Sequence, residues 1–153
     1  MATDKPCVLF LCTHNSARSQ MGEALLRHLA GDRYRACSAG TEPSTVHPLT
    51  LRVLEEAGIA TEGLRSKSVD SILGKASIRT AIMVCAQAAE SCPRIYPVAR
   101  EVLHWELDDP SRVRGSEELR LAAFRRTRDE IAGRLRDWLH LSKEARPGRP
   151  RRP

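Results

Sequence analysis

A short apolar run near the start of the chain limits its fold more than any other feature. Residues 7–11 read Cys-Val-Leu-Phe-Leu, without one charged or strongly polar side chain. A strand of this kind is buried on both faces, which is typical of the centre of a parallel sheet. Parallel neighbours need long crossover connections, usually helices. The sequence predicts four such strands, at residues 7–11, 34–38, 81–85 and 102–105.

Helical patterns separate these runs. The first follows residue 18 and ends near Gly31, the second begins at Pro48, and the third is capped by Ser116. Strands that alternate with helices predict an α/β fold, here a four-stranded parallel sheet flanked by helices on both faces. Ligands of such folds bind at the carboxyl ends of the strands. The apolar stripe of the third helix is expected to contain Phe124, Ile131, Leu135 and Trp138.

The length and charge predict one domain with a tail. We place a single domain at residues 1–141, because 153 residues suit one domain. Residues 142–153 are rich in proline and arginine and predict a disordered basic tail. The net charge is +6, but without the tail's four arginines 21 basic residues face 19 acidic ones. The charge is therefore weak evidence for nucleic acid binding, and no nucleic acid partner is expected.

The cysteines and the apolar runs favour a cytoplasmic protein. The first residues lack the apolar stretch of a signal peptide, and no run has the length of a membrane span. We therefore expect no membrane partner, reduced thiols and a monomer. The five cysteines show no zinc-type C-x-x-C pair, so neither a metal nor another cofactor is expected. Cys7 and Cys37 fall within predicted strands and are interpreted as buried, inert thiols.

The loop after the first strand carries the strongest chemical signal. At residues 12–19 a cysteine and an arginine flank five small or polar residues, between a strand and a helix. Successive backbone N–H groups and the helix N-terminus can form a cradle for a multiply charged anion. The same spacing also occurs in ordinary strand-to-helix turns. The expected oxyanion-binding residues are Thr13, His14, Asn15, Ser16, Ala17 and Arg18.

Four residues of this loop have specific expected roles. Cys12 is the expected nucleophile, and its pKa should be depressed by the positive surroundings of the cradle. Arg18 can offer a planar fork to two oxygens of the oxyanion. Ser19 can donate a hydrogen bond to the Cys12 thiolate, and Asn15 can brace the loop.

These residues resemble a known family. Residues 12–19 are similar to the phosphate loop of the low-molecular-weight tyrosine phosphatase fold. The segment Leu-Asp-Asp-Pro at residues 107–110 resembles the Asp-Pro loop of that fold. By this resemblance Asp109 is the general acid, which protonates the oxygen that leaves when Cys12 attacks.

Three further segments resemble the thioredoxin-coupled arsenate reductases that share this fold. They are residues 84–93, which contain Cys85 and Cys92, residues 104–110, and residues 124–131. The resemblance implies that Cys12 attacks arsenate, for which phosphate or sulfate would be analogues. Cys85 then attacks Cys12 and releases arsenite, and Cys92 attacks Cys85. The resemblance further implies that thioredoxin reduces the final disulfide.

The chain departs from that family in two places. Some members have a cysteine directly before the loop arginine, where this chain has Ala17. Some members also bind potassium beside the loop. Three of the four potassium-binding positions match as Asn15, Glu23 and Ser38, but the fourth is Lys67, whose ammonium would replace the cation.

Two other functions fit parts of the sequence. A tyrosine phosphatase would use the same loop, but Ser111 follows Pro110 where that family has aromatic residues, and Cys85 and Cys92 would be idle. Weak phosphatase activity is compatible with the loop. A non-enzymatic oxyanion-binding protein would have no use for a cysteine inside the anion cradle.

Overall fold

The computed structural model describes residues 5–75, 77–86 and 95–144, and in this part of the chain the central element is a parallel sheet. The strands lie in the order β2-β1-β3-β4, and each pair of neighbours is parallel. The four-stranded parallel sheet predicted from the sequence is therefore confirmed. Its strands are β1 (Cys7–Cys12), β2 (Arg35–Gly40), β3 (Ile78–Met83) and β4 (Ala99–His104).

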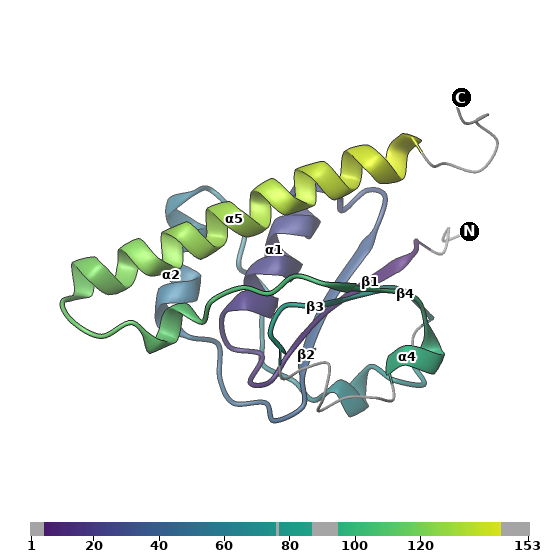
Figure 1. Ribbon diagram of the computed structural model, residues 1–153, viewed down its shortest axis with the longest axis horizontal. Coiled ribbons are helices and arrows are strands. Elements are labelled where there is room, and N and C mark those ends of the chain that lie inside the picture. Colours follow the sequence, from purple (N-terminus) through teal and green to yellow (C-terminus); the bar gives the residue numbers. More distant parts are fainter. Residues whose placement is uncertain (1–4, 76, 87–94, 145–153) are drawn as a thin grey trace.

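Helices cover both faces of this sheet (Figure 1). The first face carries α1 (Arg18–Ala30) and α5 (Glu117–Glu144), which pack on each other, and α2 (Pro48–Glu56) packs on α5. The short α4 (Ile95–Val98) and the 3-10 helix η1 (Val69–Ser71) lie on the other side. A second 3-10 helix, η2 (Pro110–Arg112), follows β4 and contacts α5.

The strand bounds differ from the prediction at β2, β3 and β4. The β2 strand continues through Gly40 instead of stopping at residue 38, and β4 covers Ala99–His104 instead of residues 102–105. The predicted third strand ran through Cys85, but β3 begins at Ile78 and ends at Met83. Its first half was missed because Arg79 and Thr80 interrupt the apolar pattern. Thr80 is nonetheless buried, and its hydroxyl donates to Glu101 on β4 at 3.1 Å. Charged residues in β4 are tolerated because it is an edge strand.

The long helix α5 begins as predicted, with the Ser116 hydroxyl accepting a hydrogen bond from the Leu119 amide at 3.2 Å. On its apolar face Phe124, Ile131 and Leu135 are fully buried. The helix continues past Leu141 to Glu144, so the expected tail does not begin at residue 142. The remainder of that predicted tail, residues 145–153, lies outside the described residues.

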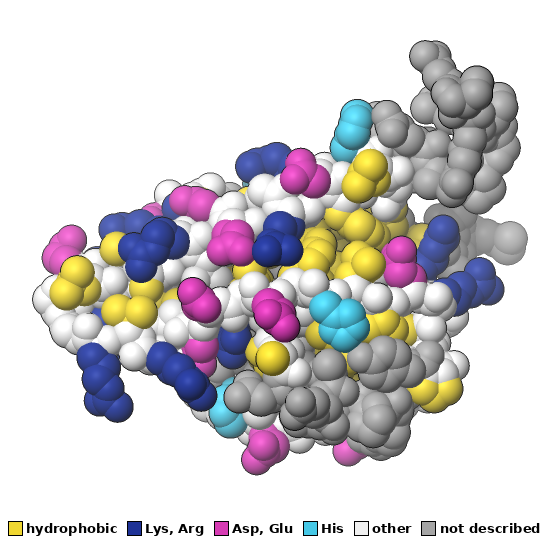
Figure 2. Space-filling model, in the orientation of Figure 1, with side chains coloured by type: hydrophobic (Ala, Val, Ile, Leu, Met, Phe, Trp, Pro, Cys, Tyr) yellow, Lys and Arg dark blue, Asp and Glu magenta, His cyan; other side chains and the backbone are white. Residues whose placement is uncertain are grey.

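The helices and the charged side chains of the described residues bear on the membrane and charge expectations. No helix in the described ranges is long and apolar enough to span a bilayer. Figure 2 shows basic and acidic side chains interspersed along the face crossed by α5, rather than separated into fields of one sign. This mixture agrees with the near balance of charge expected for the body of the chain.

The two cysteines interpreted as structural have different surroundings. Cys7 is buried in β1, as expected. Cys37, on the edge strand β2, is only partly buried. Its expected full burial was therefore wrong, because an edge strand has a neighbour on one side only.

Gly22 on α1 allows the helix to lie close to the sheet, which yields a stability prediction. A Cβ at this position would come within 2.7 Å of Phe10 Cγ, whose ring is fully buried in β1. We expect Gly22→Ala to cost about 1–3 kcal/mol through overpacking. Thermal unfolding should show a fall of several degrees in melting temperature.

Gly133 on α5 is the matched control, because a Cβ there meets nothing within 4 Å. Gly133→Ala should be neutral or stabilising by up to about 1 kcal/mol. Equal melting temperatures for the two variants would contradict the assigned packing of α1 on β1.

Candidate active site

A cleft of about 750 Å³ opens at the carboxyl ends of β1 and β3. These two strands are adjacent in the sheet, at the point where the order of the strands reverses. Such a switch point is where open α/β sheets bind their ligands. The cleft is lined by Thr13, His14, Arg18, Glu42, Cys85, Ala86, Glu106, Leu107, Asp108, Asp109 and Arg112.

Asn15 fixes the shape of the loop at residues 12–19. It has a φ of 52°, in the left-handed region that asparagine tolerates better than most residues. Its side chain is fully buried and makes two hydrogen bonds. Nδ2 donates to Ser19 Oγ at 2.8 Å, and Oδ1 accepts from the Lys67 amide at 3.0 Å. The expected bracing role thus extends from the loop to the segment before η1.

The other expected cradle residues lie around the same turn. Thr13 and His14 line the cleft, and the His14 ring contacts the Glu42 carbonyl at 3.1 Å. The Ser16 carbonyl accepts hydrogen bonds from the His47 amide and the Thr50 hydroxyl. Ala17 is the N-cap residue of α1 and has no polar side-chain atom with which to cap the helix. The first amides of α1 therefore face the end of the loop, where an anion would be stabilised.

Cys12 lies at the bottom of this loop with only 3% of its surface exposed. Its sulfur is 2.8 Å from Ser19 Oγ and accepts a hydrogen bond from the Asn15 amide at 3.2 Å. When Cys12 is a thiolate, Ser19 must be the donor, because a thiolate has no proton to give.

The expectation of a depressed pKa for Cys12 was wrong. Burial raises the pKa of this thiol above its usual value, and the hydrogen bonds from Ser19 and Asn15 offset the rise only in part. Arg18 lowers the pKa of Cys12 least among these groups. The physical reason is that the Arg18 guanidinium is engaged elsewhere: Nη1 donates to the Leu107 carbonyl at 2.9 Å.

Arg18 also connects the loop to Asp109. The distance from Arg18 Nη2 to Asp109 Oδ2 is 3.6 Å, and both side chains are largely shielded from solvent. Asp109 Oδ1 accepts hydrogen bonds from the amide and the hydroxyl of Ser111, at 3.0 and 2.7 Å. Burial raises the pKa of Asp109, but the bonds from Ser111 and the charge of Arg18 outweigh it, so the net pKa is lowered. Asp109 is therefore a carboxylate at neutral pH.

Cys85 is the second thiol of the site. The Val84 amide donates to the Leu11 carbonyl at 3.0 Å, which brings the residue after it beside the start of the loop. Cys85 is buried, and its sulfur lies 3.7 Å from Thr13 Oγ1. The structure thus brings Cys12, Arg18, Ser19, Cys85 and Asp109 together. Cys92, the third expected thiol, lies outside the described residues.

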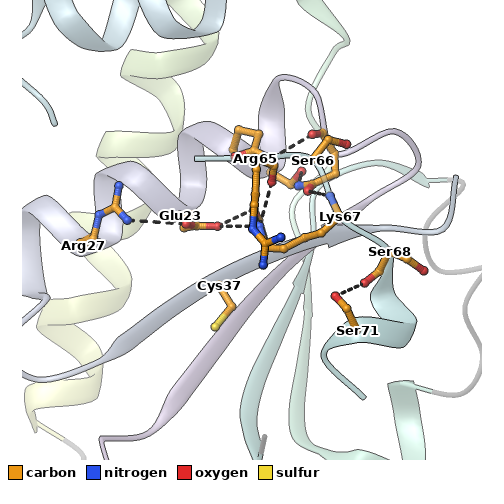
Figure 3. A network of polar contacts seen from close by, with 12 residues as sticks. Glu23, Arg27, Cys37, Arg65, Ser66, Lys67, Ser68 and Ser71 are labelled. Carbon is orange, nitrogen blue, oxygen red and sulfur yellow. Dashed lines mark hydrogen bonds and ion pairs between the residues drawn. The ribbon is translucent and has the colours of Figure 1, made fainter. Parts of the chain in front are cut away.

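Lys67 occupies the middle of a polar network beside the loop (Figure 3). Its ammonium lies 3.4 Å from Glu23 Oε1, 3.5 Å from Ser38 Oγ and 3.0 Å from the Arg65 carbonyl. Glu23 is otherwise held by Ser38, at 2.6 Å, and by Arg27. These oxygens already surround a cation that is part of the chain, so the residues present do not fit a potassium ion as well.

Sequence reasoning missed one buried residue of the site, Gln20. Its Nε2 donates to the Asn15 carbonyl at 3.0 Å and to the Arg65 carbonyl at 2.8 Å. Gln20 therefore supports the loop and the Lys67 segment together. It is fully buried on α1, but a single glutamine in the first turn of a helix gives no signal before the loop is folded.

Within the described ranges no group of three or more His, Cys, Asp or Glu is arranged to hold a metal ion.

Comparison with known proteins identifies related sequences along nearly the whole chain. Residues 7–147 match the family described as low molecular weight phosphotyrosine protein phosphatase. An arsenate reductase of Bacillus subtilis (strain 168) is 40% identical over 138 residues, which cover 89% of this chain and 96% of that protein. An arsenate reductase of Halalkalibacterium halodurans is 37% identical over 141 residues, covering 92% and 99%.

Solved structures give the same picture. A thioredoxin-dependent arsenate reductase of Corynebacterium glutamicum superimposes with a TM-score of 0.73 at 30% identity, over 95% of this chain and 66% of that one. An arsenate reductase in a phosphate binding state has a TM-score of 0.71 at 26% identity, over 88% and 97%. An arginine phosphatase has a TM-score of 0.75 at 24% identity, over 92% and 97%, which shows the fold alone.

The Ser19 hydroxyl should control the acidity of Cys12. Ser19→Ala removes a hydrogen bond that lowers the pKa of this thiol. A hydrogen bond to a charged group contributes about 1.5–3 kcal/mol, so the pKa should rise further by about 1–2 units. The rate of Cys12 alkylation against pH measures this, with Cys12→Ser as the blank. Ser111→Ala, which affects Asp109 instead, should leave the midpoint unchanged. An equal midpoint in Ser19→Ala and the wild type would contradict the assignment.

The Lys67 network predicts that potassium does not change the thermal stability of the protein. Replacing sodium chloride by potassium chloride at equal ionic strength should leave the melting temperature within about a degree, because the ammonium already neutralises Glu23. Lys67→Asp should create a potassium response, since a carboxylate would then replace the cation. Lys75→Asp, at an exposed lysine outside the network, makes the same change of charge and should not. A large potassium effect on the wild type would refute this prediction.

Proposed function

Because this chain belongs to the low molecular weight phosphotyrosine protein phosphatase family, we propose that its loop binds an oxyanion for attack by Cys12, and that the chain is an arsenate reductase. One observation carries the proposal. A second thiol, Cys85, lies at the end of the neighbouring strand and contacts Thr13 of the loop. Hydrolysis of a phosphate ester needs one thiol, whereas reduction of arsenate needs two electrons from a thiol pair. The relatives named arsenate reductase support this choice.

The first step joins sulfur to arsenic. Burial raises the pKa of Cys12, which favours the protonated thiol. Bound hydrogen arsenate is itself a base and can accept that proton. The sulfur then attacks arsenic, an arsenic–oxygen bond breaks, and the oxygen leaves as water. The products are a Cys12–arsenate adduct and one water molecule, so protons and charge balance.

Arg18 and Asp109 have complementary roles in this step. The bound dianion attracts the guanidinium of Arg18, which lines the cleft. Asp109 then loses part of its ion pair and gains a negative neighbour, and both changes raise its pKa. The carboxylate can therefore take up a proton and pass it to the leaving oxygen. Asp109 acts as a relay for a proton that arrives with the thiol or the substrate.

The second step reduces arsenic. The Cys85 sulfur attacks the Cys12 sulfur, and the sulfur–arsenic bond breaks with its electron pair going to arsenic. The proton of the Cys85 thiol passes to an oxygen of the departing arsenite, and a Cys12–Cys85 disulfide remains. Cys92 then attacks Cys85 and frees Cys12. A Cys85–Cys92 disulfide results, and thioredoxin reduces it. The roles of Cys92 and thioredoxin follow from the resemblance seen in the sequence.

The decisive experiment couples the purified chain to thioredoxin, thioredoxin reductase and NADPH. Arsenate should start NADPH oxidation, and Cys12→Ser should abolish it. Hydrolysis of an aryl phosphate, measured in parallel, should be weak. Of the three thiols Cys12, Cys85 and Cys92, it should need only Cys12. Strong phosphatase activity without arsenate-dependent oxidation would establish the phosphatase alternative. A wild type with neither activity, together with equal phosphate binding by the wild type and Cys12→Ser, would indicate a binding protein.

The two remaining thiols should fail at different stages. Cys85→Ser should form the Cys12 adduct without releasing arsenite, whereas Cys92→Ser should complete one turnover and accumulate a Cys12–Cys85 disulfide. Mass spectrometry after arsenate treatment distinguishes an arsenic adduct from the loss of two hydrogens. Cys37→Ala is the matched control, because it removes a thiol outside the cleft, and it should turn over normally. Multiple turnover in either Cys85→Ser or Cys92→Ser would exclude the three-thiol relay.

A further inference from the structure

A second pair of thiols lies at the opposite end of β1. Cys7 begins β1, and Cys37 lies on the neighbouring strand β2. Cys7 donates a hydrogen bond from its sulfur to the sulfur of Cys37, at 3.5 Å. Cys12 follows Cys7 at the far end of the strand, about 16 Å away at the usual rise per residue. The pair is therefore separate from the active-site cleft.

Both sulfurs project from one face of the sheet. Ser38 bonds to Glu23 on α1, and side chains alternate along a strand, so Cys37 projects from the opposite face. Figure 3 shows the Cys37 sulfur pointing away from Glu23 and Lys67. Cys7 pairs with Arg35 in the β1–β2 register and so shares the face of Cys37. Cys37 is partly exposed, so a small solute can reach this residue, and the buried Cys7 lies directly behind it.

The register disfavours a disulfide between these residues. Cys37 pairs with Leu9, so Cys7 and Cys37 are diagonal neighbours. A step of one strand across and two residues along separates their Cα atoms by about 8 Å. A disulfide tolerates at most about 7 Å and brings the sulfurs to about 2.05 Å. The backbone of two paired strands would have to move for this bond to form.

A bridging ion fits the same separation without such movement. Two thiolates bound to one tetrahedral ion at about 2.3 Å are about 3.8 Å apart. A pyramidal trivalent ion has narrower bond angles and brings its sulfurs slightly closer. We propose that Cys7 and Cys37 form a dithiol site that binds trivalent arsenic. The identity of the ligand rests on the proposed function, whose product is arsenite.

Coordination number and charge favour arsenite over zinc. Zinc in a closed site takes four ligands, and within the described ranges no third His, Cys, Asp or Glu joins this pair. Trivalent arsenic takes three, and the third can remain a hydroxyl group directed to solvent on the partly exposed side. Arsenite is neutral at pH 7, and so is its bis-thiolate adduct. Binding beside the apolar core therefore buries no net charge.

The ionisation of the pair also favours attack of sulfur on arsenic. The hydrogen bond from Cys7 lowers the pKa of Cys37 to about 7, with Arg35 and Lys67 acting in the same direction and burial and Glu23 opposing them. The same contact raises the pKa of Cys7. At neutral pH the pair therefore loses one proton readily and keeps the other. The Cys37 thiolate attacks arsenic first, and the displaced hydroxyl group takes up the proton that Cys37 released and leaves as water. Cys7 then displaces a second, so two thiols and arsenite yield the adduct and two water molecules, with no oxidation.

The test uses sodium arsenite and the full chain with Cys12→Ser, Cys85→Ser and Cys92→Ser, which leaves only this pair. Native mass spectrometry should show one arsenic per chain, and a thiol titration should show the loss of two thiols per arsenic. Replacing Cys37 or Cys7 by alanine in that background should weaken binding at least about 100-fold, because the second thiol acts intramolecularly. Melting temperatures establish that each variant is folded, and Cys37→Ala, at the partly exposed residue, is the safer variant.

Three results would overturn the proposal. They are the absence of an arsenic adduct, equal affinity after removal of one cysteine, and the loss of two hydrogens without bound arsenic, which would identify a redox pair instead. No turnover is required. Arsenite binding by the triple variant without turnover of the wild type in the coupled assay would refute the proposed function alone. Turnover of the wild type without arsenite binding by the triple variant would refute this site alone.

Discussion

The active-site loop depends on the buried side chain of Asn15. With its backbone in the left-handed region, Asn15 turns its amide toward Cys12 while its carboxamide bonds to Ser19 and to the Lys67 backbone. One residue thus fixes Cys12, its hydrogen-bond partner Ser19 and the neighbouring segment. Any other side chain of similar size would lose one of these bonds or adopt this backbone at a cost of about 1–2 kcal/mol. Because the hydrogen bonds are formed before an anion arrives, the loop needs little reorganisation to bind one.

The pairing of β1 with β3 adds the second requirement, which is a thiol next to the nucleophile. Both strands are buried along the register that ends at Leu11 and Met83, so their ends are held by the core and not by the cleft. The loop after β1 and the turn after β3 then have to meet. A shift of two residues in this register would separate Cys85 from Thr13. The proposed redox chemistry therefore depends on the same apolar strand residues that limit the fold.

Features with a local signal could be predicted from the sequence. The buried strand, the loop at residues 12–19 and the cap at Ser116 each have a signal within a few residues. The properties that failed depend on distant neighbours. The direction of the shift in the Cys12 pKa was misjudged, because it depends on how deeply the sulfur is buried and on the hydrogen bond from Arg18 to the Leu107 carbonyl. Gln20 was overlooked because its partners, Asn15 and Arg65, meet only after folding. The start of β3 was missed because Thr80 finds its partner on another strand.

The four cysteines in the described part of the chain form two pairs, one at each end of β1, and their surroundings separate their chemistry. Cys12 receives hydrogen bonds from groups that are not thiols, which offset part of the cost of burying its thiolate in front of an anion cradle. Cys37 receives its hydrogen bond from another thiol and lies within a strand, not at the start of a helix. A tetrahedral dianion is therefore attracted more strongly to the first pair. A neutral, thiophilic product has the opposite preference, because it gains little from the cradle and gains two sulfur ligands from Cys7 and Cys37. Under the two proposals, the two oxidation states of arsenic would bind at opposite ends of one strand.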